Sequence, residues 1–172
     1  MFYRAKTIKE GKWVHGHYVR LEDCEKGRES HRIYSGYAES EPDTSDSYEF
    51  FADWHEIDKG TLGRSTGKCD SLGEPIYEGD VVRITRFAMH ALGGHIDGQT
   101  ITQDCIVYWD DELAAFRYWV KVDCGSIRGF LVFKDERAER VEVKIIGNVF
   151  DLPDFRDGYG QAVSGSAQSG KE

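Results

Sequence analysis

Hydrophobic and polar residues alternate along much of the chain with a period of two, which is the repeat of a β-strand. In residues 12–20 the odd positions Trp13, His15, His17 and Val19 share one face of a predicted strand. The pattern offers few apolar stripes of helical spacing, so it favours a fold built mainly from strands.

The second half of the chain contains several such segments close together. We expect five strands, near residues 81–86, 103–109, 115–122, 130–134 and 141–149. Gly and Asp separate them, as is typical of tight turns, and closely spaced short strands favour an antiparallel sheet that curls into a small barrel.

These elements predict a mainly β fold with little helix, in a single domain over residues 1–156. An N-terminal β region (1–60) is expected to pack through a turn-rich corner (61–80) onto a five-stranded SH3-like barrel (81–156). Residues 157–172 are rich in Gly and Ser and poor in bulky apolar side chains, so we expect them to form a disordered tail.

Composition supports a globular protein and constrains its partners. The 172 residues are 40% hydrophobic and 13% aromatic, and the net charge is −9, which disfavours non-specific binding of a phosphate backbone. The charge is uneven, however: residues 1–20 carry +4, whereas residues 39–58 carry −8. The acidic stretch is either a solvated loop or a surface that meets a basic partner, such as the N-terminus of a neighbouring subunit.

Apolar segments and cysteines bear on the cellular location of the protein. The most apolar short stretch, residues 130–133, is far shorter than a membrane-spanning helix, and the N-terminus lacks the apolar core of a signal peptide. We therefore expect a protein of the host cytoplasm that does not enter a membrane. The cysteines are widely spread without a Cys-x-x-Cys pair, so we expect free thiols at Cys24, Cys69, Cys105 and Cys124.

Residues 66–82 form the densest local pattern. Asp70 to Gly73 suits a type I turn, and Glu78 to Asp80 forms a second turn before a strand. Asp80 is a candidate catalytic acid, but an Asp in this position more commonly accepts backbone N–H bonds, with Gly79 supplying a positive φ. The pattern-forming residues are Thr66, Gly67, Asp70, Gly73, Ile76, Tyr77, Glu78, Gly79 and Asp80.

This run resembles the central motif of the YopX family of phage and prophage proteins, T-G-x-x-D-x-x-G-x-x-I-Y-E-G-D-x-V. The opening residues 3–6 and 12–16, and residues 145–153 with Gly147 and Asn148, are similar to the two ends of that family. Val149, Phe150 and Leu152 depart from the usual Ile, Tyr and Asn, and a long loop over 85–103 is unlike the family pattern. The resemblance implies a small β-rich protein that assembles as a homo-oligomer. It implies no biochemical activity and no catalytic residues.

Two histidines provide a candidate metal site. His15 and His17 share a strand face, a common geometry for metal ligands, and His31, His55, Cys24 or an acidic-stretch Asp would be the third ligand. Such a pair also occurs by chance on a half-buried sheet face. His90 and His95 lie in a Gly-rich predicted loop, where we expect solvated side chains rather than metal ligands. Cys69 lies beside Lys68, which favours a thiolate, but it has no histidine partner in its sequence context, so the sequence does not favour a nucleophile there.

A basic and aromatic strand provides a candidate nucleic-acid surface. Arg117, Trp119 and Lys121 are expected on one face of the 115–122 strand, where they could stack a base and meet phosphate. The alternative is an exposed strand face, or an oligomer contact that buries Trp119.

No Walker A, Gly-x-Ser-x-Gly or His-Glu-x-x-His string occurs in the sequence. We therefore expect a non-catalytic phage or prophage accessory protein that acts by binding or oligomeric assembly, without a cofactor. A nucleic-acid-binding module and a metal-dependent enzyme are the alternatives, and a host or phage protein is a further candidate partner. The large aromatic content predicts a dimer or trimer with Trp119 or Trp54 at the contact.

Overall fold

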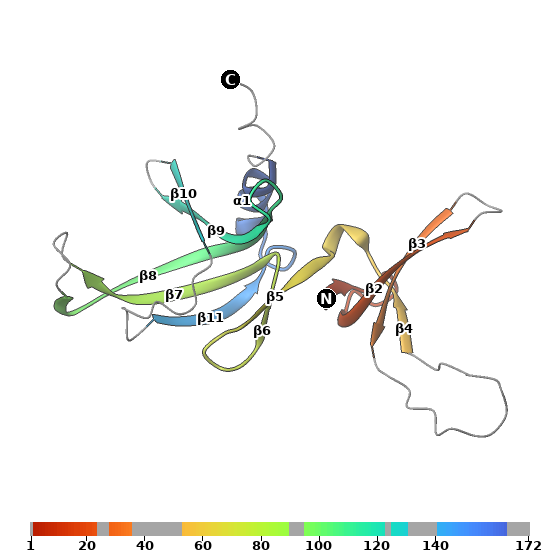
Figure 1. Cartoon of the computed structure of the whole chain (residues 1–172), viewed down its shortest axis with the longest axis horizontal. Helices are drawn as coiled ribbons and strands as arrows, with labels where there is room; N and C mark the ends of the chain where they lie inside the picture. The colour runs from red at the N-terminus through yellow and green to blue at the C-terminus, as the bar shows by residue number, and fades with distance from the viewer. Residues whose placement is uncertain are drawn as a thin grey trace. The chain divides into compact units, whose positions relative to one another are not determined.

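The computed structural model describes residues 2–23, 28–35, 53–89, 95–122, 125–130 and 141–164. Antiparallel strands make up most of this part of the chain, with one α-helix near its C-terminal end (Figure 1). The mainly β prediction is confirmed. The chain divides into two compact units, residues 1–65 (unit 1) and 66–172 (unit 2), and the predicted corner 61–80 contributes to both.

Unit 1 is a sheet in the order β4-β3-β2-β1-β5. Its elements are β1 (Tyr3–Lys6), β2 (Trp13–Asp23), β3 (Arg28–Ser35), β4 (Asp53–Glu56), the 3₁₀ turn η1 (Lys59–Thr61) and β5 (Gly63–Cys69), whose last residues continue into unit 2. Ala5, Ile33 and Ile57 are fully buried on one face, with Val14 and Tyr18 packed against them. Because side chains alternate along a strand, the neighbouring residues Arg4, Trp13 and Arg32 belong to the opposite face.

Unit 2 contains the short β6 (Pro75–Tyr77), which follows β5, and a sheet in the order β10-β9-β8-β7-β11. The other elements are β7 (Asp80–Met89), β8 (His95–Asp110), β9 (Ala115–Val122), β10 (Gly125–Phe130), β11 (Val141–Asn148) and helix α1 (Pro153–Ser164). Among the described residues, no ladder joins β10 to β11. The five strands therefore form an open sheet, and the predicted SH3-like barrel is not confirmed.

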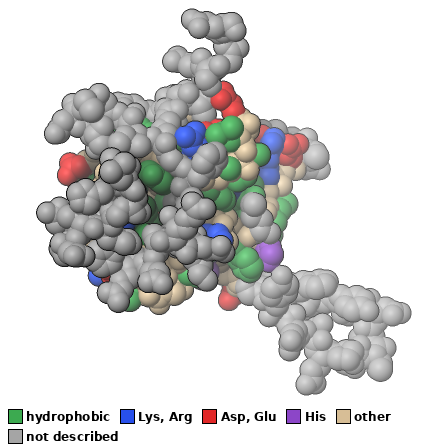
Figure 2. Space-filling model, turned by 60° about the vertical axis from the view of Figure 1, so that its left-hand side comes forward, with side chains coloured by type: hydrophobic (Ala, Val, Ile, Leu, Met, Phe, Trp, Pro, Cys, Tyr) green, Lys and Arg blue, Asp and Glu red, His purple; other side chains and the backbone are tan. Residues whose placement is uncertain are grey.

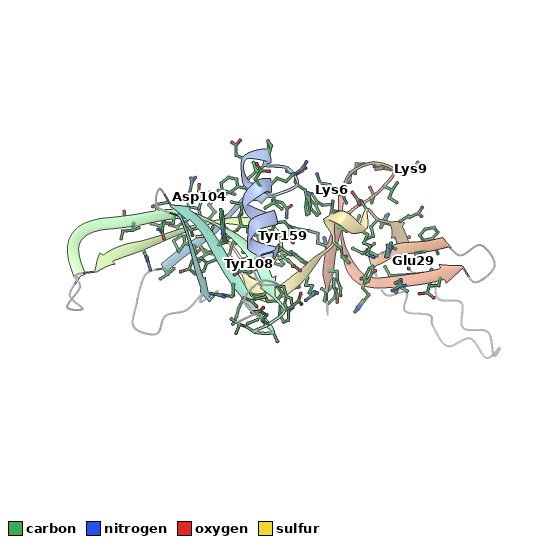
Figure 3. All side chains as sticks on the ribbon, turned by 90° about the horizontal axis from the view of Figure 1, so that it is seen from above. Lys6, Lys9, Glu29, Asp104, Tyr108 and Tyr159 are labelled. Atoms are coloured by element: carbon green, nitrogen blue, oxygen red, sulfur yellow. The ribbon has the colours of Figure 1, made fainter. Side chains whose placement is uncertain are left out.

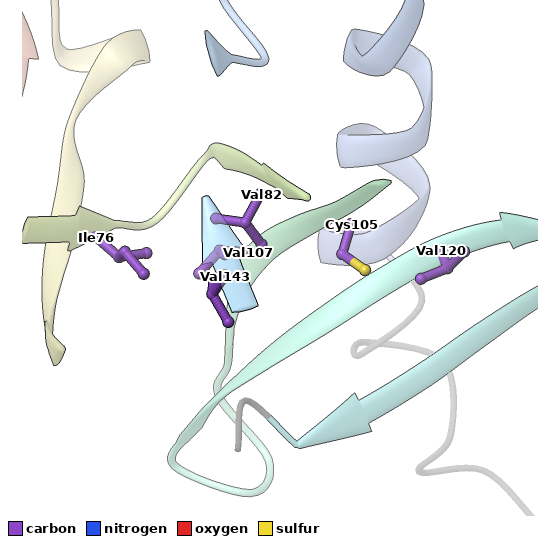
Figure 4. Close-up of a cluster of buried hydrophobic side chains, with 6 residues drawn as sticks. All are labelled: Ile76, Val82, Cys105, Val107, Val120 and Val143. Atoms are coloured by element: carbon purple, nitrogen blue, oxygen red, sulfur yellow. The ribbon is translucent and has the colours of Figure 1, made fainter. Parts of the chain in front are cut away.

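Both faces of the unit 2 sheet are covered by apolar side chains. One face carries the cluster shown in Figure 4: Ile76, Val82, Cys105, Val107, Val120 and Val143. The other face carries Tyr108 and Trp119, and α1 packs over it through Phe155 and Tyr159. Burial on two faces explains why β8 contains the continuous apolar run from Cys105 to Tyr108.

Three boundaries differ from the sequence prediction. Strands β7 and β8 extend to Met89 and from His95, so most of the expected 85–103 loop is a long hairpin. The fourth strand of the sheet is 125–130 rather than 130–134, and residues 131–140 lie outside the described part of the chain. The disordered tail predicted from residue 157 is wrong up to Ser164, because these residues belong to α1.

Candidate functional site

The outer face of the unit 1 sheet gathers basic and aromatic side chains. We call it the cation–aromatic face and define it by the residues that the strand register places opposite the core. They include Phe2, Arg4, Lys6, Trp13, His15, His17, Arg32, Tyr34 and Trp54, and the register places Val19, Leu21, Ser30 and Glu56 on the same face.

A row of rings crosses this face from strand to strand. His17 on β2 pairs with Tyr34 on β3, and Tyr34 pairs with Trp54 on β4. The ring of Phe2 lies 4.9 Å from the ring of His17, measured between centroids, and extends the row toward β1. Phe2 is 49% exposed and Trp54 is 50% exposed, so both ends of the row are open to solvent.

Each tryptophan of the face is stacked with a cation. The guanidinium of Arg32 lies 4.0 Å from the centre of the Trp54 ring. Arg4 and Lys6 lie 4.6 and 5.3 Å from the centre of the Trp13 ring. Each contact contributes about 0.5–1 kcal/mol at an exposed site. The stacks therefore hold positive charge beside aromatic surface.

The two faces of the unit 1 sheet differ in charge. Glu22 and Glu29 lie on the opposite face, where both bind Arg20 with N–O distances of 2.6 and 2.7 Å. Lys6 of the cation–aromatic face and Glu29 are both labelled in Figure 3. On the cation–aromatic face, Glu56 lies directly across from Arg32. The described surface visible in Figure 2 mixes hydrophobic, basic and acidic side chains.

A groove of about 370 Å³ lies beside Trp54, between β4 and the turn that joins β1 to β2. Lys9 and Lys12 line it, together with Glu10. Lys12 forms an exposed ion pair with Glu10 at 2.7 Å. The groove adds further charged side chains next to the ring row.

The nucleic-acid row predicted on β9 is not an open surface. Arg117 and Trp119 do share a face, but Trp119 is only 5% exposed, because its ring lies against Gly158 of α1. Arg117 donates to the buried Asp110 carboxylate at 3.0 Å. The side chain of Lys121 lies outside the described part of the structure. Since residues 157–164 of α1 were expected to be disordered, the sequence could not show what covers Trp119.

The predicted Asp70 turn is a hydrogen-bonded corner. Oδ1 of Asp70 accepts from the backbone N–H groups of Leu72 (2.8 Å) and Glu74 (3.0 Å), and Oδ2 accepts from Ile145 (3.2 Å). Burial of the carboxyl opposes its ionisation, but these donors outweigh burial and hold the pKa of Asp70 below its ordinary value. The next residue, Ser71, exchanges two hydrogen bonds with Val143 of β11.

The Asp80 turn is a second, fully buried corner. Asp80 accepts from the backbone N–H of Tyr77 at 2.8 Å and from the side-chain amide of Asn148 at 3.2 Å. Gly79 has φ +83°, a left-handed conformation that a side chain would strain. Its N–H donates to Val107 and its carbonyl accepts from Val149. Asp80 therefore joins β6, β7 and the end of β11.

The remaining motif residues support the same two corners. Thr66 Oγ1 donates to the carbonyl of Ile76 at 2.8 Å, and Glu78 accepts from the N–H of Trp109 at 3.4 Å. Gly67 and Gly73 have positive φ angles, and a side chain on Gly147 would meet Leu152 at 2.5 Å.

The candidate metal ligands are divided between two sheet faces. His15 and His17 share the cation–aromatic face, whereas His31 and His55 lie on the opposite face of the sheet. His31 is bonded to the Tyr18 hydroxyl at 2.7 Å. Within the described ranges, no cluster of His, Cys, Asp or Glu is arranged to hold a metal ion. Cys24, His90 and residues 39–52 of the acidic stretch lie outside those ranges.

Sequence reasoning found part of the cation–aromatic face and missed the rest. The shared face of Trp13, His15 and His17 and the basic N-terminus were both visible in the sequence. The contribution of Arg32 and Tyr34 was missed because β3 was not predicted as a separate strand. A period-two pattern over residues 28–35 would have placed Arg32 and Tyr34 on one face of a strand.

A known protein family matches most of the chain. The family model described as YopX protein matches residues 2–155, which is most of the chain. No curated protein and no solved structure matches it. Among the described helices, none has the length and apolar content needed to cross a membrane.

Proposed function

Since this chain belongs to the YopX family, we propose that it is a non-catalytic, phage-type accessory protein of the host cytoplasm that acts by binding a partner. The cation–aromatic face of unit 1 is its binding surface. The observation that carries this proposal is the stack of Arg32 on the half-exposed Trp54, next to a row of rings.

The buried carboxylates support binding rather than catalysis. Perturbed carboxyl groups are common at active sites because proton transfer requires tuned pKa values. Here Asp70, Asp80 and Asp110 are buried, yet each accepts hydrogen bonds that build turns or hold a strand. These hydrogen bonds give each of the three carboxylates a structural role in the fold.

The test is partner retention by the full chain. The affinity-tagged protein and the variants Trp54→Ala and Arg32→Gln are expressed in a bacterial host, and retained protein and nucleic acid are both quantified. We expect each variant to lose most of the retained partner. Leu72→Ser, at a 73% exposed position in unit 2, is the matched control and should retain it. Equal retention by the wild type and all three variants would show that the cation–aromatic face is not the binding surface.

A second candidate function is self-assembly into a dimer or trimer. Of the two tryptophans predicted at the contact, Trp119 is buried by its own chain, whereas Trp54 is exposed. The opposite charges of residues 1–20 and 39–58 favour contact between copies. Light scattering should then give a multiple of 19.6 kDa, reduced by Trp54→Ala. A monomer mass at tens of micromolar protein, in both low and moderate salt, would exclude assembly.

A further inference from the structure

We propose that the ligand of the cation–aromatic face is single-stranded nucleic acid. This inference rests on the proposed function and names the chemistry of the partner. It is carried by the cross-strand ring row and by the cation stacks on the two tryptophans.

The ring row suits unpaired bases. Every base has an aromatic face, so stacking on a protein ring tolerates any base sequence. His17, Tyr34 and Trp54 belong to the neighbouring strands β2, β3 and β4, Phe2 directly precedes β1, and adjacent strands lie about 4.8 Å apart. Rings on an open sheet face can therefore stack successive bases along one direction, from β1 toward β4.

The stacked cations suit the phosphates of the same strand. Arg32 lies at the Trp54 end of the row, and Arg4 and Lys6 lie around Trp13 on β1 and β2. A guanidinium that stacks on a ring keeps its N–H groups in the guanidinium plane, where they can bind phosphate oxygens. Positive charge therefore accompanies the ring row on two strands, β1 and β3.

A single strand fits this surface better than a duplex. In a duplex the faces of the bases are stacked on one another, so rings on a sheet could reach only the backbone. The half-exposed rings of Trp54 and Phe2 would then have no base on which to stack. We therefore expect the protein to bind a single strand more tightly than the corresponding duplex.

The net charge of −9 opposes binding of any nucleic acid, but this repulsion acts only over short distances in salt solution. At about 0.1 M salt, charges separated by more than about 10 Å are largely screened from one another. Binding is then decided by the side chains within reach of the strand. Neutralising two or three phosphates would make affinity fall roughly 7- to 20-fold between about 50 and about 200 mM salt.

The test is fluorescence anisotropy of labelled oligothymidylate, oligouridylate and a mixed-sequence duplex, titrated with the full-length protein. We expect binding of the single strands, and the two single-stranded arms distinguish DNA from RNA. Trp54→Ala should weaken binding roughly 5- to 100-fold, and Trp54→Phe should restore most of it because a ring is retained. Arg32→Gln should also reduce the salt dependence.

Lys59→Gln is the matched control for charge. Lys59 lies in η1 of the same unit, outside the cation–aromatic face, so its loss should change affinity little. The inference is overturned if neither single strand binds at low salt, if the duplex binds equally well, or if Lys59→Gln weakens binding as much as Arg32→Gln. A face occupied by a second copy would appear as Trp54-dependent oligomers that bind no oligonucleotide, which also overturns it.

The outcomes separate this inference from the proposed function. If partner retention depends on Trp54 but the retained partner is a protein and no oligonucleotide binds, the ligand class is wrong and the binding face stands. If neither retention nor oligonucleotide binding depends on Trp54 or Arg32, both proposals fail.

Discussion

A single carboxylate at residue 70 holds together chain segments that are distant in sequence. Asp70 accepts N–H groups from its own turn and from Ile145 on β11, and it is only 8% exposed. Its pKa is lower in the folded protein than the ordinary value of 3.8. Below about pH 4 the unfolded chain therefore binds more protons at this carboxyl than the folded chain does. The free energy of unfolding consequently decreases as the pH falls.

This arrangement predicts the effect of Asp70→Asn. An amide has one acceptor oxygen instead of two, so at least one N–H loses its partner, at a cost of about 1–3 kcal/mol in the free energy of unfolding at neutral pH. The stabilisation by Asp70 is fully present above the unfolded pKa and is lost as pH falls through the folded pKa. The variant should therefore lose less stability than the wild type between pH 5 and pH 3.

Urea unfolding at a series of pH values measures both effects. Glu142→Gln removes an exposed carboxylate from β11 and serves as the control, with stability close to wild type. An Asp70→Asn protein with the wild-type acid dependence would show that the carboxylate is not the titrating group.

Turn residues such as Asp70, Gly79 and Asp80 could be predicted from sequence because their hydrogen bonds are largely local. Asp70 bonds the N–H groups two and four residues ahead, and Asp80 bonds Tyr77 three residues back. The partner Asn148 could not be assigned to Asp80 in the same way, because their contact depends on how β7 pairs with β11.

At the scale of elements, helix α1 decides which side of the unit 2 sheet is hidden. Its sequence contains Gly158 and Gly160, and glycine is about 1 kcal/mol less favourable than alanine within a helix. Propensity alone therefore favoured disorder. Packing overrides it, because Phe155 and Tyr159 cover Trp119 and Ile106. Neglect of this packing explains both the disorder that was predicted from residue 157 and the open surface that was predicted at Trp119.

The two glycines of α1 predict opposite effects of substitution by alanine. A Cβ on Gly158 would lie 2.5 Å from the Trp119 ring, so Gly158→Ala should destabilise unit 2 by about 1–3 kcal/mol. A Cβ on Gly160 meets nothing within 4 Å, so Gly160→Ala should stabilise the helix by up to about 1 kcal/mol. Thermal unfolding of both variants measures the difference. Stabilisation by Gly158→Ala equal to that by Gly160→Ala would contradict the docking of α1 on Trp119.

At the scale of the whole molecule, each unit has a core of its own. Ile33 is fully buried with Ala5 and Ile57 in unit 1, and Val107 is fully buried in unit 2. The alternating pattern predicted β2 in unit 1 and most strands of the unit 2 sheet, but it missed β3, which carries Ile33. It could not predict where the chain divides, because β5 is a continuous strand across residue 65.

Separate cores predict separate effects on hydrogen exchange. Ile33→Ala leaves a cavity that costs about 2–5 kcal/mol, so it should reduce amide protection in β2 and β3. The matched variant Val107→Ala should reduce protection in β7, β8 and β9 instead. Peptide-resolved exchange by mass spectrometry measures both. A loss of protection in β8 upon Ile33→Ala, as large as the loss in β3, would contradict this division.

The contacts of Asp70 and Ser71 with β11 have a consequence for colloidal behaviour. β11 ends the sheet of unit 2, and an end strand with unpaired N–H and C=O groups is a template for edge-to-edge aggregation. Ser71 binds both the N–H and the C=O of Val143, and Asp70 binds the N–H of Ile145. The turn thus takes the place that an added strand would need. A variant that loses this turn would expose unpaired N–H and C=O groups along the edge of β11. We therefore expect such a variant to precipitate by edge-to-edge pairing before it unfolds.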